Sequence, residues 1–401
     1  MTKYENILKE MEHELEDFDK NSDKINNGYT YEKSFKAIVQ KYEEKLLQTS
    51  MGDIPKSRNQ KLSIQTSIGE IIVKKGHVMS QCPMGFRISP YLQEHMCRLG
   101  LKLVFEEASE ELEALVNISI DAKQIERVCH CYGDLVDRID WQEAYTDGIQ
   151  LKLTYKNDEP VYVMADGSMI LTREEKWKEI KLGRIFSEGS HVEELSKDRG
   201  FITDSVYCAH LGKAEGFWEK FSEQIPNSNK LVFICDGSKW LWNYINDLYP
   251  ESTQILDFYH CKEHLYSFAK VCFGNNQSEI DSFVDKVVDY FFDKAVDKAF
   301  NEIKQVECDN QTKEKERQKL LNYLEGNKKR INYGVFRQQG LLIGSGPIES
   351  AHRDVIQKRL KLSGQRWTIK GAQQIANLRV YYKSNNWNKV VSLITEFKKI
   401  A

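Results

Sequence analysis

VYVMADG (residues 161–167) is a run of five apolar residues that ends in an Asp-Gly pair, and LVFICDG (residues 231–237) repeats the pattern further along the chain. Short apolar runs bounded by turn residues are typical of buried strands. The two runs therefore predict an α/β domain, and they place Asp166 and Asp236 at the ends of two of its strands.

The segments around these runs give the order of the expected elements. Residues 178–187 and 201–210 are predicted to be strands, and residues 253–256 (TQIL) a further strand. Helical periodicity covers residues 214–224 and 240–248. The resulting order is three strands, helix, strand, helix, strand. That is the order of a ribonuclease H-like sheet, so we expect a mixed α/β core of this class.

An all-helical block is expected to interrupt this core. From His260 to about Leu324 the apolar residues follow a helical period. The longer of two apolar faces, capped by Ser278, consists of Ile280, Phe283, Val284, Val287, Val288, Phe291, Ala295, Val296, Ala299 and Ile303. The core still lacks its closing helix at this point. That helix is expected at Ile348, after the turn GSGP (residues 344–347), because proline fits the first turn of a helix.

The N-terminal third is predicted to be mainly helical. Residues 1–45 carry an acidic bias, which indicates a solvated acidic face or a dimerising or capping helix. Two short strands punctuated by glycine are expected within residues 63–81. An amphipathic helix at 107–116, ended by Asn117, and a second helix from Ser119 then have the outline of a helix-turn-helix. A plain helical hairpin has the same pattern.

The second of these helices is expected to bury Ile125 and Val128 and to present Lys123, Gln124 and Arg127 to DNA. The expected domains, in chain order, are an acidic helical segment at 1–45, a DNA-recognition region with a β-hairpin and the helix-turn-helix at 46–155, the first part of the ribonuclease H-like core at 156–262, the helical insertion at 263–340, the closing part of the core at 341–382 and a C-terminal tail at 383–401.

The net charge is distributed unevenly along the chain. The sequence carries 57 Lys/Arg against 60 Asp/Glu, a net charge of −3, which taken alone argues against nucleic-acid binding. Residues 311–401, however, hold 19 Lys/Arg and 6 Asp/Glu, a net charge of +13, so the first 310 residues carry −16. This asymmetry predicts one surface that faces a polyanion. With 41% hydrophobic and 29% charged residues, the composition excludes wholesale disorder and fibrous classes.

The sequence opens on MTKYE and a Glu-rich stretch, so no secretory signal is expected. No apolar run approaches the ~18 residues of a membrane span. The nine cysteines include no Cys-x-x-Cys pair, which favours reduced thiols. We therefore expect a cytoplasmic protein without membrane contact.

Three carboxylates occupy informative positions. Asp166 and Asp236 each follow an apolar run, and Glu349 lies in the first turn of the closing helix. Ligands gather at strand ends of an α/β sheet, and converging acids repel one another unless a cation lies between them. Such a set predicts two Mg²⁺ or Mn²⁺ ions, which activate a water or a 3′-hydroxyl for in-line attack on a phosphodiester. Taken singly, an Asp-Gly pair is also a common hairpin turn, and Glu349 a partner for the helix dipole.

Several motifs together carry a family resemblance. They are MADGS (164–168), CDGSKW (235–240), LDFYH (256–260), GSGPIES (344–350), KRLKLSGQRW (358–367), GA (371–372) and LR (378–379). Jointly they resemble the DDE transposases of bacterial insertion sequences, and most of all the ISKra/ISLre-like groups, which are related to the Mutator-like elements. The resemblance covers residues 160–380. It implies that Asp166, Asp236 and Glu349 are the catalytic metal ligands and that a helical insertion separates the second Asp from the Glu.

Histidines near these motifs add candidates. Asp257 and His260 look like a (Cys/Asp)-x-x-His signature of such transposases, which would hold the scissile DNA or orient a metal ligand. A structural Asp–His pair fits the same residues. His352, in the closing helix, is a candidate contact to a phosphate or to a metal ligand. His260 and His264, with Cys261 between them, also have a spacing that suits Zn²⁺, although the further Cys/His ligands of a zinc site are missing from the pattern.

Basic residues follow Glu349 and are expected to bind DNA phosphates, although a solvated basic face is the alternative. They are Arg353, Lys358, Arg359, Lys361, Arg366 and Lys370. Trp367 is predicted either to stack on an unpaired base or to cap the core.

We therefore expect a DNA transposase of a mobile genetic element. It would bind double-stranded DNA at the terminal inverted repeats of its insertion sequence, cleave each end to free a 3′-hydroxyl and join that hydroxyl to target DNA, with no cofactor beyond two Mg²⁺ or Mn²⁺ ions. Pairing of two ends in DNA transposition predicts a homodimer or a higher synaptic oligomer, associated with the nucleoid. The alternatives are a ribonuclease H-fold nuclease without strand transfer and a domesticated, inactive DNA-binding protein.

Overall fold

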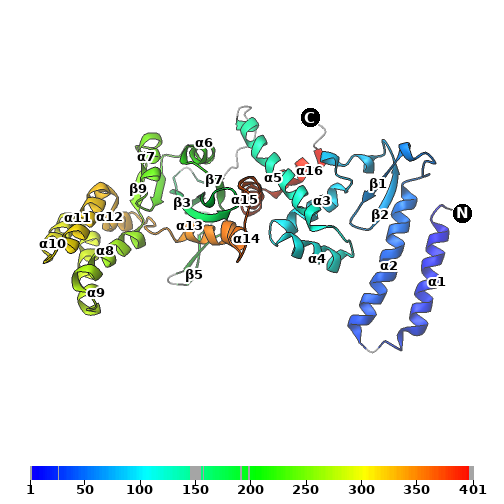
Figure 1. Cartoon of the computed structure of the whole chain (residues 1–401), viewed down its shortest axis with the longest axis horizontal. Coiled ribbons are helices and arrows are strands. Elements are labelled where there is room, and N and C mark those ends of the chain that lie inside the picture. Colours follow the sequence, from blue (N-terminus) through cyan, green and yellow to red (C-terminus); the bar gives the residue numbers. More distant parts are fainter. Residues whose placement is uncertain are drawn as a thin grey trace. The chain divides into compact units, whose positions relative to one another are not determined.

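The chain divides into two compact units (Figure 1). The first comprises Met1–Val136 with Asn388–Ala401, and the second comprises Asp137–Trp387. The computed structural model describes residues 2–25, 27–144, 155–156, 158–189, 192–196 and 199–396. None of the helices in these ranges is long and apolar enough to cross a membrane.

The second unit is built around a mixed five-stranded sheet. Its strands are β3 (Val161–Thr172), β4 (Lys176–Ser187), β7 (Val206–Leu211), β8 (Leu231–Cys235) and β9 (Thr253–Leu256), arranged in the order β7-β4-β3-β8-β9. The first three strands pair antiparallel, whereas β8 runs parallel to β3 and β9 runs parallel to β8. Helix α6 (Ala214–Gln224) precedes β8, and α7 (Lys239–Leu248) follows it. The predicted element order and the mixed α/β core are confirmed.

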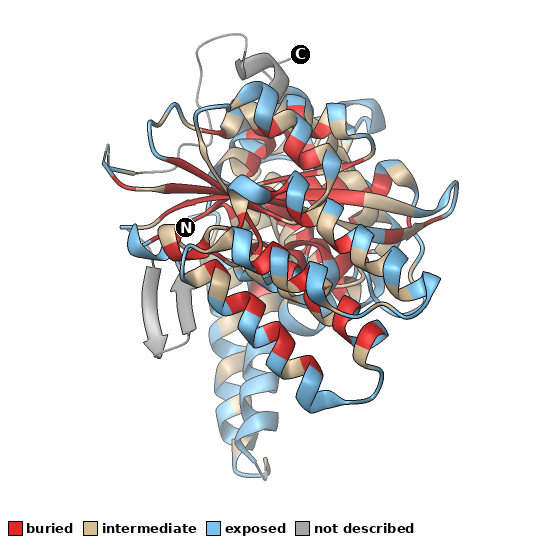
Figure 2. Cartoon of the chain, turned by 90° about the vertical axis from the view of Figure 1, so that its left-hand side faces the viewer, coloured by how far each residue is buried: buried red, intermediate tan, exposed pale blue. Residues whose placement is uncertain are grey.

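Apolar side chains explain why the sheet forms. All five residues of β8 are buried, and so are the first five of β3 (Figure 2). Helix α6 buries Phe217, Trp218 and Phe221. A side chain at Gly183 of β4 would overlap the ring of Phe221, so this glycine allows the helix to approach the sheet. Each buried aliphatic or aromatic side chain contributes about 1.5–3 kcal/mol to the stability of this core.

Two strand boundaries differ from the prediction. β3 continues through Asp166 and Gly167, because both residues pair with β4 after the parallel pairing with β8 has ended at Val163. The strand predicted at 201–210 is divided between β7 and β6 (Arg199–Ile202), and β6 pairs instead with β5 (Val192–Ser196) in a separate two-stranded sheet.

The block between β9 and the closing segment is helical throughout. Its elements are α8 (Phe258–Phe273), α9 (Gln277–Phe292), α10 (Val296–Gln305), α11 (Gln311–Gly326), the 3-10 turn η4 (Lys328–Arg330) and α12 (Tyr333–Gln338). The long apolar face predicted from Ile280 to Ile303 belongs to two helices, because Lys294 adopts a left-handed φ of 60° between α9 and α10. The cap of α9 is Asn276 rather than Ser278.

The closing segment contains α13 (Gly346–Ala351), a π-helical turn (His352–Gln357), α14 (Lys358–Leu360) and α15 (Ile369–Lys383). A π-helical turn leaves main-chain carbonyls without their usual partners and is frequent at functional sites. Here the buried guanidinium of Arg379 in α15 donates hydrogen bonds to the carbonyl oxygens of Asp354 and Val355. Arg379 therefore helps to hold the turn in this conformation.

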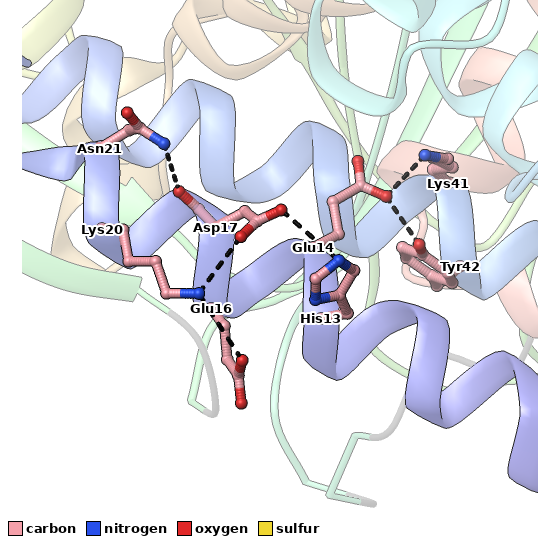
Figure 3. Close-up of polar contacts among 8 residues, drawn as sticks. All are labelled: His13, Glu14, Glu16, Asp17, Lys20, Asn21, Lys41 and Tyr42. Atoms are coloured by element: carbon pink, nitrogen blue, oxygen red, sulfur yellow. Dashed lines mark hydrogen bonds and ion pairs between the residues drawn. The ribbon is translucent and has the colours of Figure 1, made fainter.

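The first unit begins with a hairpin of α1 (Glu5–Ser22) and α2 (Gly28–Ser50). The described part of α1 buries no residue, and it contacts α2 through ion pairs and through the ring of Phe18 against those of Tyr31 and Phe35. Figure 3 shows Glu14, whose carboxylate accepts from Lys41 Nζ and Tyr42 Oη, both at 2.6 Å. The exposure of α1 is compatible with both alternatives for residues 1–45, a solvated acidic face and a dimerising or capping helix.

The rest of the first unit is a small hairpin followed by helices. These elements are η1 (Arg58–Gln60), β1 (Lys61–Gln65), β2 (Glu70–Lys74), η2 (Val78–Ser80), η3 (Pro83–Gly85), α3 (Pro90–Gly100), α4 (Phe105–Val116), α5 (Ala122–Ala144, which continues into the second unit) and α16 (Trp387–Glu396). The helix predicted from Ser119 begins three residues later, where Asp121 accepts from the Lys123 N–H. Residues 383–401, expected to be a tail, include α16, and residues from Asn388 onward group with the N-terminal unit.

Candidate active site

Asp166 lies inside β3, opposite Leu182 of β4, with its side chain 36% exposed. The N–H of Gly167 donates to Asp166 Oδ1 at 2.7 Å. Burial raises the pKa of Asp166 from 3.8 to about 6, with smaller contributions from the negative charges of Asp236 and Glu179, while His260 acts in the opposite direction. Asp166 is thus a carboxylate in a partly desolvated position with like charges around it.

Asp236 follows directly after β8, on the strand next to β3. Its two carboxylate oxygens accept from the N–H and the hydroxyl of Ser238, at 2.9 and 2.8 Å, and its main-chain carbonyl accepts from Trp242 Nε1 at 2.6 Å. A side chain at Gly237 would overlap the ring of Tyr323 from α11, so glycine is needed there for close approach. Neither Asp-Gly pair forms a hairpin turn, which excludes that alternative for both.

His352 is the closing-segment side chain that contacts Asp166. Its Nε2 lies 3.6 Å from Asp166 Oδ2, and the imidazole is only 3% exposed. Burial lowers the pKa of His352 to about 4, and the positive charge of Lys361 lowers it further, whereas Asp166 acts in the opposite direction. Near neutral pH this is therefore a contact between a carboxylate and a neutral imidazole.

Glu349 is the third of the predicted carboxylates. It is exposed in α13, and its Oε1 accepts from the hydroxyl of Ser345 at 3.1 Å. Within the described ranges, no three Asp, Glu, His or Cys side chains are close enough together to hold a metal ion. Asp166 and Asp236 fit a cation, because a positive charge would offset both the burial of the Asp166 carboxylate, which is the main cause of its raised pKa, and the smaller repulsion by Asp236. The predicted three-carboxylate cluster is not assembled in this conformation.

The carboxylate of Asp257 is used in structural hydrogen bonds and is not exposed to bind a metal ion or DNA. It is buried (2% exposed) and caps α8, with Oδ2 accepting from the His260 N–H at 3.0 Å. Its other oxygen, Oδ1, accepts from the N–H of Ser345 at 2.8 Å. Asp257 therefore ties the insertion to the loop that precedes Glu349, which favours the structural alternative for this aspartate. His260 is exposed and close enough to Asp166 to affect its pKa.

The insertion contributes side chains that the sequence did not single out. Tyr323 packs on Gly237 and stacks on His264, with ring centroids 4.0 Å apart. Cys261, between His260 and His264 in the sequence, is fully buried, and no zinc cluster forms among the residues that the structure describes. Glu179 was also missed, because its place beside Asp166 depends on the register of β4 against β3.

Two residues predicted to contact DNA are buried instead. Arg359 is completely buried, and its guanidinium lies 4.8 Å from the centre of the Trp367 ring. Trp367 is 7% exposed because its main chain pairs with the end of β3, where its N–H donates to the Leu171 carbonyl and its carbonyl accepts from the Arg173 N–H. Trp367 therefore caps the core, and Arg359 is not available to a phosphate in this conformation.

The other predicted basic residues of the closing segment lie at the surface. They are Arg353, Lys358, Lys361, Arg366 and Lys370, and Lys358 pairs with Asp354. The effect of Lys361 on the pKa of His352 places this ammonium group near the Asp166–His352 contact. In the first unit, Lys123 and Arg127 are exposed and Gln124 is partly exposed, while Ile125 and Val128 are buried as predicted.

Asp166→Asn is expected to raise the melting temperature above pH 6. The folded chain holds its proton up to a pKa of about 6, whereas the unfolded chain releases it near the ordinary value of 3.8, so Asp166 lowers stability as the pH rises between these values. Asparagine has no proton to lose. Thermal scans of both proteins across this range should give a difference that is small near pH 4 and largest above pH 6. A difference that does not change with pH would contradict the assignment.

No curated protein matches this chain. Residues 29–393, however, match the model of a family described as Uncharacterised protein family (UPF0236), and because the match spans most of the sequence, the chain belongs to that family.

Proposed function

We propose that this protein is a DNA transposase of the DDE type, with a ribonuclease H-like catalytic core. The observation that carries the proposal is the pair of aspartates on the neighbouring parallel strands β3 and β8, where burial and, to a smaller extent, the charge of Asp236 raise the pKa of Asp166. The strand order β7-β4-β3-β8-β9, with three antiparallel strands followed by two parallel ones, supports the ribonuclease H-like assignment.

Asp166 and Asp236 are the proposed metal ligands, with Glu349 as the third. Mg²⁺ or Mn²⁺ bound there would supply the Lewis acid for phosphodiester cleavage and for the attack of the freed 3′-hydroxyl on target DNA. Glu349 lies three residues before His352, whose imidazole contacts Asp166. The segment that bears Glu349 therefore belongs to the same site, even though its carboxylate bonds to Ser345 in this conformation.

The proposed substrate is double-stranded DNA. Among the described basic residues of the insertion, Lys313, Lys319 and Lys328 form ion pairs with Asp309, Glu316 and Asp297. Arg353, Lys361 and Arg366 are exposed after Glu349, and none of them forms an ion pair with an acidic residue that the structure describes. Lys361 acts on the pKa of His352, so part of this positive charge lies near Asp166, where a scissile phosphate would have to lie. Helices α4 and α5 of the first unit are proposed to recognise the terminal repeats, with Lys123, Gln124 and Arg127 facing the DNA.

Replacing Arg353, Lys361 and Arg366 together with glutamine is expected to weaken DNA binding and its dependence on salt. If each side chain contacts one phosphate, the slope of log K against log salt should become less steep by about 2.7. Fluorescence anisotropy with a DNA duplex over a salt series measures this slope. The matched control replaces Lys313, Lys319 and Lys328, whose charges are paired, and should leave the slope unchanged. Equal slopes for the first variant and the wild type would contradict the proposed surface.

The activity itself is tested with the full chain, Mn²⁺ and two duplexes that carry the repeats flanking its gene, one uncut and one pre-cleaved to expose the 3′-hydroxyl. Joining of this end to a second DNA is the expected result. Cleavage that never proceeds to joining would identify a nuclease instead. DNA binding with neither product would identify an inactive DNA-binding protein.

A further inference from the structure

Arg184 is a buried arginine in the middle of β4. It is 5% exposed, and its guanidinium carbon lies 5.4 Å from the ring centroids of both Phe186 and Tyr207. Its Nε donates to Ser205 Oγ at 3.0 Å, and its Nη1 donates to the main-chain carbonyl of Pro347 at 2.7 Å. The guanidinium thus links the sheet to a residue 163 positions later in the chain.

Pro347 lies two residues before Glu349. The loop that precedes Pro347 is held by a second element, the start of α8. The carbonyl of Ile343 accepts from the Phe258 N–H at 3.0 Å, and the Ser345 N–H donates to Asp257 Oδ1 at 2.8 Å. The segment 343–347 is therefore fixed by hydrogen bonds from β4 on one side and from the start of α8 on the other. The hydroxyl of Ser345 then bonds to Glu349 itself.

Stability alone does not account for a charged group at this position. The hydrogen-bond acceptors of Arg184 are neutral oxygens, and burial lowers its pKa. A buried charge without a bonded counter-charge is costly, and an apolar side chain of similar volume often stabilises such a site. A methionine in place of Arg184 would not donate the hydrogen bond to the Pro347 carbonyl.

We propose that Arg184 is a positioning residue for the candidate active site. It holds Pro347 against the sheet and thereby sets where the Glu349 carboxylate stands relative to Asp166 and Asp236. This inference rests on the proposed function in one respect, because it takes Glu349 to be a metal ligand. Asp257 is the second anchor of the same loop.

The test uses Arg184→Met and Arg184→Lys in the full chain, with Arg317→Met as the matched control. Arg317 also pins a loop through main-chain carbonyls, at 2.9 Å from Val306 O and 3.1 Å from Lys304 O, but it lies in the insertion. Hydrogen–deuterium exchange follows the amides of residues 343–352, and electron paramagnetic resonance titration measures Mn²⁺ affinity.

Arg184→Met is expected to increase exchange in 343–352 and to weaken Mn²⁺ binding, each about tenfold, since the buried charge-assisted hydrogen bond to Pro347 is lost together with the one to Ser205. Arg184→Lys should recover part of both effects, because lysine retains a donor. Arg317→Met should alter neither. If Arg184→Met exchanges its amides at the wild-type rate, Arg184 does not anchor this segment. If the amides lose protection but the Mn²⁺ affinity is unchanged, Arg184 does not position Glu349.

Failure of the proposed function gives a different result. In that case Glu349→Gln would leave the Mn²⁺ affinity of the otherwise unchanged chain unaltered. The exchange measurement on Arg184→Met would still decide whether the anchor exists, because it does not depend on metal or DNA.

Discussion

Asp236→Asn is expected to reduce metal-dependent DNA cleavage on the order of 10³-fold, which corresponds to several kcal/mol of lost transition-state stabilisation. Asparagine retains an oxygen that can accept from the Ser238 N–H, so the turn after β8 should persist. Removing the charge also removes the repulsion that adds, after burial, to the raised pKa of Asp166. The melting temperature should therefore stay equal or increase while activity disappears.

The matched control for this substitution is Asp247→Asn, at an exposed position near the end of α7 in the same unit. It removes the same charge from the protein and should leave cleavage unchanged. Initial rates with a labelled duplex, measured for both variants beside the wild type, decide the question. Full activity in Asp236→Asn would remove this aspartate from the proposed site.

Gly334→Ala is expected to cause the largest loss of stability from a single methyl group. Gly334 lies in α12, and a Cβ there would overlap the main-chain carbonyl oxygen of Phe292 at the end of α9. Main chain cannot rotate away as a flexible side chain does, so the two helices must separate. Such overpacking costs about 3 kcal/mol, and for a unit of this size it lowers the melting temperature by roughly 10 °C.

Gly326→Ala serves as its control. Gly326 is the last residue of α11 and has open space around the position of a Cβ. Alanine should leave the stability unchanged or raise it by up to about 1 kcal/mol, because alanine favours a helix over glycine. Differential scanning calorimetry of both variants gives the comparison. Equal melting temperatures for the two would show that α12 does not depend on this close approach.

The order of strands and helices along the chain was predictable because local patterns encode it. The apolar runs before Asp166 and Asp236 mark two buried strands wherever their neighbours lie. The length of β3 was not predictable, because its second half is a strand only through pairing with β4. The same limit explains the division of the long helical face at Lys294, since a left-handed residue interrupts a helix without interrupting the apolar period.

The two aspartates of the candidate site could be predicted from the sequence, but the side chains around them could not. Arg359 and Trp367 follow Glu349 in a basic segment, yet the pairing of Trp367 with Leu171 and Arg173 draws both side chains inside. Arg184 stands in a strand segment with several other charged residues, and nothing in that pattern tells which of them faces the core. Its partner, Pro347, lies far along the chain. Long-range pairing of this kind leaves no local signal.

The grouping of Asn388–Ala401 with Met1–Val136 has a consequence for biosynthesis. Val390, Leu393 and Ile394 of α16 are buried, so the N-terminal unit completes its core only after the ribosome has translated the other unit. Domains generally fold as they emerge, the first one first. In this chain the translation of the region proposed to recognise DNA starts before that of the other unit and is completed after it, which delays the maturation of this region.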